Sequence, residues 1–278
     1  MRYYSLFSLL LLALLTTACG NRNEAMDNVE ENANKLDPVE LADDPGTVTM
    51  SRNGITLTSM PDAAEFPNAS LDDWTYQDGQ FSYTASNYDF GQQTPDASSI
   101  MCANSGKGQH AHLIVNNDPY IAKYDPEFEL ELPDGTHHIL TFLSRSYHLS
   151  IKNGKAHRAV KAEVKDNSFA STENITGPML FYSRPKGSYK GKQNTENILL
   201  DFYPINAELG AGGYTVKVVV NGSTEFMLDT WQPYFLQGLP MGENTVELTL
   251  MKDGAMVEAP LNPVKRTFTL EALPTESK

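Results

Sequence analysis

An internal repeat constrains the fold more than any other feature of this chain. The stretch Val115–Leu143 returns about a hundred residues later as Val220–Leu250. The copies share Pro-x-Phe and Leu-Pro-x-Gly at matching places, after a first hairpin that is two residues longer in the second copy. A repeat of this kind marks a repeated structural unit, so the sequence predicts two domains with the same chain path.

The runs between the turns predict β-strands. Ile55–Thr58 and Gln80–Ala85 place apolar residues at every second position, and Asn53-Gly54 is a hairpin signal. Helical apolar spacing with caps is missing after residue 47. Short strands separated by frequent turns fold into sandwiches or barrels. The predicted fold class is therefore all-β, with two tandem immunoglobulin-like β-sandwich domains.

Composition divides the chain into five predicted parts. They are a signal peptide (1–18), an acidic disordered tether (19–46), a first sandwich (47–167), a linker (168–177) and a second sandwich (178–278). The tether lacks aromatic residues and carries many acids, so it cannot bury enough apolar surface to order itself. The linker is rich in Asn, Ser, Thr and Gly.

The first residues predict secretion and a lipid anchor. Arg2 precedes an apolar run that is too short to span a bilayer. The run ends in Thr16-Thr17-Ala18-Cys19, which resembles the lipobox of bacterial lipoproteins and implies acylation of Cys19. The alternative is an ordinary secretory signal in which Cys19 is incidental. Gly20 stands where a retention aspartate would be expected for the inner membrane, so the outer membrane is predicted, on its periplasmic or its surface face.

Net charge limits the classes of binding partner, and the cysteine content excludes a disulfide. Removal of residues 1–18 takes away Arg2 and moves the formal charge from -14 to -15. Such acidity argues against nucleic acid and against a peripheral hold on anionic lipid, so membrane attachment would be through the lipid. With Cys19 acylated, Cys102 is the remaining cysteine, and an intrachain disulfide is excluded.

The first copy contains a candidate metal site where it departs from the second. Its connection from Gly91 to Val115 is longer than the matching one. His110 and His112 share one face of a strand, and Met101 and Cys102 lie in the extra segment. Nitrogen and sulfur ligands suit copper or zinc. Aligned on the repeat, the two histidines match Thr215 and Lys217, so they are expected to point outward; a polar surface without metal is the alternative.

Two basic segments are candidate anion or partner sites. Arg184, Lys186, Lys190 and Lys192 form a cationic loop in an acidic protein, and Arg145 with His148 lies in an insertion before Ile151. Guanidinium groups bind phosphate or carboxylate through paired hydrogen bonds, whereas lysines act as point charges. The alternative for each segment is a solvated loop.

Several segments resemble one known group of proteins. Tyr182–Gly187, Leu200–Tyr203 and Trp231–Asn244 are similar to a family of uncharacterised bacterial envelope lipoproteins with tandem immunoglobulin-like modules. The resemblance extends from about Gln80 onward. Some members carry a phosphopeptide-binding label, which implies an acidic ligand.

Catalytic motifs are missing from the sequence. It contains no Gly-x-Ser-x-Gly, no His-Glu-x-x-His and no phosphate-binding glycine loop. The predicted function is a non-enzymatic envelope lipoprotein that binds or scaffolds a protein or an acidic ligand, without a cofactor. The alternative is a periplasmic lipoprotein that binds copper or zinc.

The lipobox gives the first testable prediction. Radiolabelled fatty acid should enter the wild-type protein and not the Cys19→Ser variant, because the thiol is the acylation site. Label in both proteins, or release of the wild type into the periplasm, would contradict it.

Overall fold

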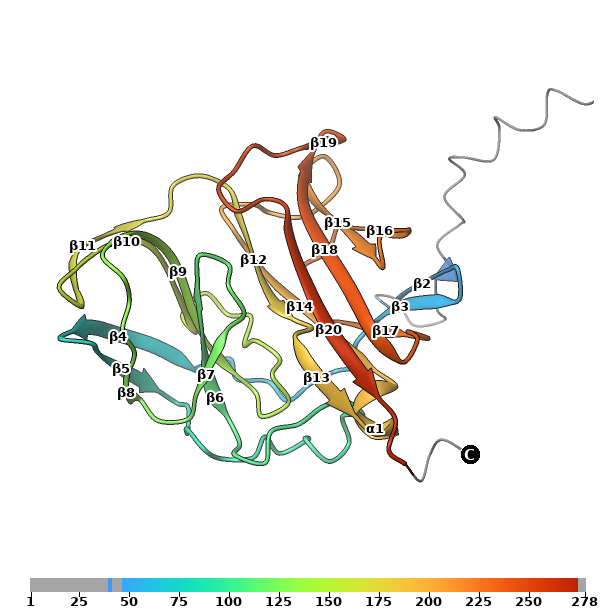
Figure 1. The fold of residues 1–278 in the computed structure, drawn as a ribbon, viewed down its shortest axis with the longest axis horizontal. Coiled ribbons are helices and arrows are strands. Elements are labelled where there is room, and N and C mark those ends of the chain that lie inside the picture. The colour runs from blue at the N-terminus through green and yellow to red at the C-terminus, as the bar shows by residue number, and fades with distance from the viewer. Residues whose placement is uncertain (1–39, 42–46, 275–278) are drawn as a thin grey trace, which may run out of the picture. The chain divides into compact units, whose positions relative to one another are not determined.

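Strands make up most of the described residues, 40–41 and 47–274 of this computed structural model, as the alternating sequence predicts (Figure 1). The signal peptide, Cys19 and the predicted tether, apart from the two-residue strand β1, lie outside these residues. No helix in the described part is long and apolar enough to cross a bilayer.

The first copy of the repeat folds into two sheets. One sheet has the order β4 (Ser70–Gln77), β5 (Gln80–Ser86), β8 (Glu127–Glu129). The other has the order β11 (Ser168–Asn174), β10 (His157–Lys165), β9 (Gly135–Ser144), β6 (His110–Val115), β7 (Ile121–Lys123). Their apolar faces meet in one core that contains Phe81, Leu113 and Ile139.

The second copy also folds into two sheets. One has the order β1 (Glu40–Leu41), β2 (Val48–Arg52), β3 (Ile55–Ser59), β17 (Tyr234–Gln237), β14 (Ile198–Ile205), β12 (Met179–Arg184). The other has the order β13 (Gly187–Lys190), β20 (Val264–Glu271), β18 (Gly242–Lys252), β15 (Tyr214–Val220), β16 (Thr224–Leu228), and β19 (Ala255–Met256) pairs with β18. A four-residue helix, α1 (Lys192–Thr195), follows β13.

Strand order confirms the predicted fold class and the repeat. The sheet β4-β5-β8 corresponds to β12-β14-β17, and β7-β6-β9-β10 corresponds to β16-β15-β18-β20. Val115 pairs with Ile139 in the first copy, and Val220 pairs with Val246 in the second. The repeated sequence therefore encodes a repeated immunoglobulin-like sandwich.

Two predicted segments belong elsewhere. We expected residues 47–59 in the first sandwich, but β3 pairs with β17 and buries Leu57 in the core of the second. A hairpin pattern specifies its own turn, not the sheet edge that it joins. Residues 168–174 of the predicted linker form β11, an edge strand on β10. Its mostly exposed side chains need no apolar alternation, so its composition resembles that of a loop.

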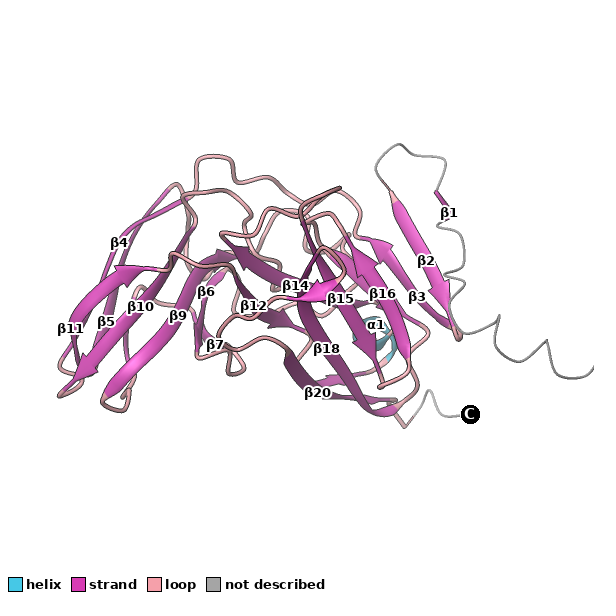
Figure 2. Cartoon of the chain, turned by 90° about the horizontal axis from the view of Figure 1, so that it is seen from above, coloured by secondary structure: helices cyan, strands magenta, loops and turns pink. Residues whose placement is uncertain are grey.

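A third apolar cluster lies between the sandwiches. Ile114, Leu140 and Phe142 on the outer face of the β6–β9 sheet pack against residues of β12 and β14, including Phe181 and Tyr203. Figures 1 and 2 both show β12 beside β9. The central strands of the first sandwich are therefore buried on both faces.

Buried polar contacts cross the same boundary. The Asn117 side chain accepts a hydrogen bond from the Tyr182 amide and donates to the Leu180 carbonyl, so it pairs with β12 as a strand would. The fully buried Asp201 carboxylate accepts from the Ser150 amide and hydroxyl, and Lys152 Nζ lies 2.6 Å from it. These contacts fix the position of the 145–152 loop against β14.

Asp201→Ala should lower the free energy of unfolding by about 3–5 kcal/mol, because it leaves Lys152 without its buried partner. The matched control is Glu173→Ala, which removes an exposed pair with Lys161 at 2.7 Å and should leave the unfolding curve unchanged. Urea denaturation of the three proteins measures the difference. Equal midpoints for all three would show that the buried pair contributes nothing to stability.

Candidate functional site

Three histidines meet beneath the second sandwich. His110 and His112 project from β6, and His148 comes from the turn that follows β9. The Nε2 atom of His110 lies 3.0 Å from Nε2 of His112 and 3.0 Å from Nδ1 of His148. In the described part of the chain, these residues are the one group of three metal-binding side chains close enough to share an ion, with ligand atoms within 4.8 Å of one another. We call them the histidine triad.

The exposure predicted for His110 and His112 is wrong. Both point away from their own sandwich core, in which their neighbours Ala111 and Leu113 are buried, as the alternation requires. However, both histidines are 0% exposed. Rings of the same sandwich, Tyr124 on His110 and Tyr120 on His112, cover them, and Ser183 of the second sandwich contacts His112. The matching Lys217 keeps some exposure because its face of β15 is not covered in this way.

Hydrogen bonds orient the two strand histidines. His110 Nδ1 lies 2.8 Å from the Gly108 carbonyl, so this nitrogen carries the proton and Nε2 presents a lone pair. Gly108 has φ +86, and a Cβ atom there would clash with the Gly91 backbone, so glycine is required at this position. His112 Nδ1 lies 3.3 Å from the Ser183 hydroxyl of β12. Metal-bound histidines usually have partners of this kind on the second ring nitrogen.

Tyr120 and a strained turn position the remaining ring. The Tyr120 ring stacks on His112 with centroids 3.5 Å apart and an angle of 7°, and its hydroxyl lies 3.2 Å from His148 Nδ1. His148 has φ +69, a left-handed conformation that side-chain-bearing residues seldom adopt. Such strain persists where the surrounding structure imposes it, often at functional sites.

The three rings of the triad compete for one hydrogen-bond acceptor. With its proton on Nδ1, His110 has one lone pair on Nε2, yet two ring nitrogens lie 3.0 Å from that atom. One lone pair cannot accept two good hydrogen bonds. A cation that accepts lone pairs from all three rings would remove the conflict.

Burial keeps the triad neutral. Desolvation lowers the pKa of His110 to about 4 and holds the pKa values of His112 and His148 well below the usual range. The positive charges of Arg184 and Lys186 add to the effect on all three. The rings are therefore neutral at pH 7, the protonation state in which imidazole binds metal.

The two predicted sulfur ligands do not join the triad. Cys102 is buried in a separate apolar cluster with Tyr147 and Leu149. Desolvation raises the pKa of its thiol to about 12. The Met101 side chain is 50% exposed. The inserted segment contributes two histidines and no sulfur to this group.

The cationic loop divides into a buried part and an exposed part. Arg184 is 7% exposed, and its Nη1 donates to the Tyr189 hydroxyl at 2.8 Å. Lys186 is half-buried and donates to the Tyr120 carbonyl at 2.7 Å. Lys190 and Lys192 are exposed, and Lys190 lies 3.6 Å from Glu271. The four cations of the predicted anion site therefore do not form one surface, because Arg184 is buried.

Arg145 has a structural role. Its guanidinium is buried and donates to the carbonyls of Ala64 and Ser150, and its own carbonyl accepts from the His148 amide. It therefore shapes the turn that carries His148. The expected pairing of Arg145 with His148 at an anion site is replaced by this supporting role.

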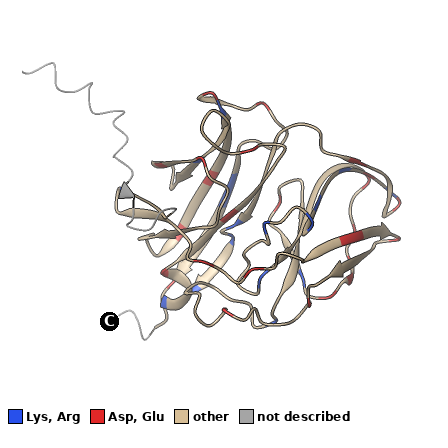
Figure 3. Cartoon of the chain, turned by 180° about the vertical axis from the view of Figure 1, so that it is seen from behind, with Lys and Arg blue, Asp and Glu red and all other residues tan. Residues whose placement is uncertain are grey.

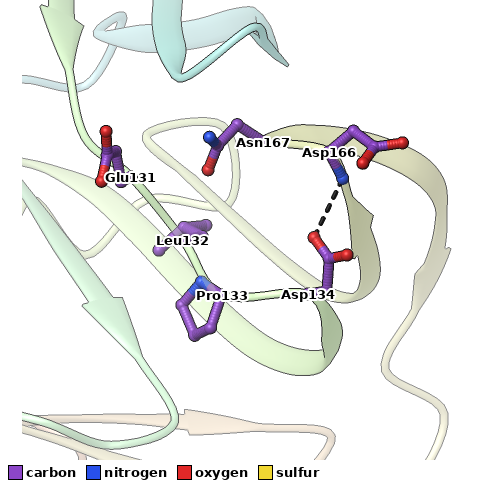
Figure 4. A pocket seen from close by; sticks show the side chains of 6 residues that line it. All are labelled: Glu131, Leu132, Pro133, Asp134, Asp166 and Asn167. Atoms are coloured by element: carbon purple, nitrogen blue, oxygen red, sulfur yellow. Dashed lines mark hydrogen bonds between the residues drawn. The ribbon is translucent and has the colours of Figure 1, made fainter.

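Elsewhere in the described residues, no second group of three His, Cys, Asp or Glu side chains is close enough to share an ion. Figure 3 shows Lys and Arg interspersed with Asp and Glu over both sandwiches. A pocket beside the β10–β11 turn carries Glu131, Asp134 and Asp166, and the Asp166 amide donates to Asp134 Oδ1 at 2.9 Å (Figure 4). These three acids are exposed, so this pocket is a solvated turn.

Sequence reasoning missed Tyr120 and Ser183 at this site. Both come from segments that resemble ordinary hairpin and strand sequence, and only contact between the sandwiches brings them to the histidines. The sequence predicts His148 as an anion ligand, and its distance in sequence from His110 does not indicate that the two rings meet.

Comparison with known proteins identifies no family. No protein-family model and no curated protein matches the chain. Among solved structures, fibronectin(III)-like modules of Clostridium thermocellum CbhA align at 11% identity over 78% of this chain and 94% of that chain, with a TM-score of 0.27.

Two further structures give similar values. The first is described as the extracellular domain of a one-component system from B. thetaiotaomicron, at 13% identity over 83% of this chain and 30% of that chain, with a TM-score of 0.24. The second is SGBP-B of the Bacteroides ovatus mixed-linkage glucan utilization locus with a heptasaccharide, at 11% identity over 80% and 72%, with a TM-score of 0.20. Likeness at this level carries no argument about a ligand of this chain.

The buried thiol gives a prediction for this region. At pH 8, a thiol with a pKa of about 12 is thiolate in about one molecule in ten thousand, so iodoacetamide should label native Cys102 far more slowly than unfolded Cys102. The Cys19→Ser variant removes the other thiol, and mass spectrometry reports the label. Equal labelling rates in native buffer and in urea would refute the buried, protonated state.

Proposed function

We propose that this protein is a non-enzymatic binding module whose ligand is a transition-metal ion, zinc or copper, held by the histidine triad. The observation that carries the proposal is the convergence of three buried, neutral imidazoles on one point, with the Nε2 lone pair of His110 facing two other nitrogens at 3.0 Å.

The distances suit an ion of this size. Nitrogen ligands lie about 2.0–2.1 Å from zinc, which in a tetrahedral site places two of them about 3.3–3.4 Å apart. The two closest nitrogen pairs of the triad, at 3.0 Å, need a small outward shift to reach that spacing, and the third pair, within 4.8 Å, needs to close. Imidazole ligands suit zinc and copper, whereas magnesium and calcium prefer oxygen.

The burial of the triad favours metal binding over catalysis on a substrate. His110 and His112 are wholly enclosed, and His148 is the one partly exposed member of the triad. A large substrate could not reach the metal without separating the sandwiches. Together with the missing catalytic motifs, this supports a binding role. The proposed location is the cell envelope, where Cys19 would supply the lipid anchor. A protein partner in the envelope remains part of the proposal.

Metal titration tests the proposal. Chelator-treated full-length protein should bind one Zn(II) or one Cu(I) per chain, as measured by calorimetry and metal analysis. His110→Ala or His148→Ala should weaken binding by more than the roughly 10–100-fold that outer-shell changes cost. Ser183→Ala, which removes the His112 partner, should fall within that range.

His138→Ala provides the matched control. His138 lies on β9 outside the triad, so its replacement should leave metal affinity unchanged. Absence of binding by the wild type, or equal affinity in the wild type and the His110→Ala/His112→Ala double variant, would overturn the proposal.

A further inference from the structure

Two cations beside the triad have no acidic partner. Within residues 47–274, the ion pairs involve Lys152, Lys161 and Lys190, and neither Arg184 nor Lys186 forms one. Arg184 is more than nine-tenths buried, and its Nε atom has no hydrogen-bond partner in the described structure. The Tyr189 hydroxyl and the rings of Tyr120 and Tyr189 face the guanidinium, but none of them carries a negative charge. A buried cation without a counter-charge is costly, so an anion here would be stabilised.

Tyr120 places these cations next to the triad. Its ring stacks on His112 with centroids 3.5 Å apart, and Lys186 Nζ lies 3.9 Å from the same centroid. Since His112 occupies one face of the ring, Lys186 covers the other. The Arg184 guanidinium carbon lies 5.3 Å from this centroid, and the Tyr120 hydroxyl contacts His148. One aromatic ring therefore connects the metal ligands with both cations.

A bound metal ion would add positive charge to a site that already has cations around it. Three neutral imidazoles leave the ion its full double charge if it is Zn(II), and Arg184, Lys186 and nearby Arg266 are all positive. Desolvation, followed by the charges of Arg184 and Arg266, already lowers the pKa of Lys186 to about 8. A three-histidine site also leaves the fourth tetrahedral position open. Bound water supplies at most one negative charge there, as hydroxide, whereas an oxyanion also offers further oxygens to Arg184 and Lys186.

We propose that the metal at the histidine triad carries an oxyanion, a phosphate or a carboxylate, as its fourth ligand, and that Arg184 and Lys186 pair with that anion. The inference rests on the proposed metal site. The proposal places the acidic ligand that the sequence predicts. One of its oxygens would bind the metal, and the others would accept hydrogen bonds from Arg184 Nε and the Lys186 ammonium group. Metal and anion then bind cooperatively.

The test uses Co(II), whose visible spectrum reports its ligands, and metal-free full-length protein. Saturating inorganic phosphate should strengthen Co(II) binding by at least about fivefold and change the bound Co(II) spectrum. Linkage is reciprocal, so Co(II) should strengthen phosphate binding by the same factor. Acetate in a parallel titration separates the two ligand classes: the anion with the larger effect identifies the class, and either supports the proposal.

A charge variant gives two effects of opposite sign. Lys186→Gln should bind Co(II) more tightly than the wild type when no oxyanion is present, because a repelling charge is gone, and should lose most of the phosphate effect. Lys190→Gln, which removes an exposed cation 3.6 Å from Glu271, is the matched control and should change neither quantity.

The outcomes separate this inference from the metal site itself. If the wild type binds no metal, the proposed function fails and the inference fails with it. If Co(II) binds but neither phosphate nor acetate changes its affinity or spectrum, the metal site stands and the oxyanion is overturned. Phosphate binding of equal strength with and without Co(II) also overturns it, because the anion would then not be a metal ligand.

Discussion

Burial of one sheet face by a second, repeated domain is the constraint on which the rest of this structure depends. In an isolated sandwich, the outer face of β6 and β9 would meet water. Here Ile114 and Phe142 pack under Phe181 and Tyr203. The same contact helps to remove His112 from solvent. The desolvation that keeps these rings neutral therefore comes from the first sandwich's own rings, Tyr120 and Tyr124, together with the β12 strand of the second.

Polar groups on such a face must find partners, and most of them do. Asn117 substitutes for a strand at the edge of β12, and Asp201 collects three donors from the 150–152 segment. Beside the triad, two ring nitrogens face the one lone pair of His110 Nε2, and the buried Nε of Arg184 has no hydrogen-bond partner among the described residues. The Tyr182 hydroxyl, His157 Nδ1 and Arg266 Nε are also buried without a partner there. Unpartnered buried polar groups are uncommon in folded proteins, and at the triad they stand beside three converging imidazoles, which favours a binding site there.

The repeat predicted the topology, because matching apolar positions in two copies specify matching registers. The same periodicity placed His110 and His112 on one strand face, away from their own core. It could not show that this face is covered, since the covering residues, such as Phe181, are separated from it by a whole domain. Nor could it join His148 to the pair, because a loop's path depends on buried contacts such as those of Arg145. The assignment of the β2–β3 hairpin to the first sandwich is wrong for a related reason: its sequence pattern contains no information about the sheet edge that it joins.

Comparison of the two copies shows what the metal site requires. His112 pairs with Phe142 across the sheet, and at the matching place in the second copy Lys217 pairs with Thr249. The backbone geometry is repeated, so strand position alone does not make the site. The first copy adds the turn that carries His148 and a neighbouring domain that provides Ser183, Arg184 and Lys186. Because the ligands come from one sandwich and the charges around them from the other, any motion that separates the sandwiches would expose the metal and remove the anion's partners together. Metal occupancy and the contact between the domains are therefore expected to stabilise each other.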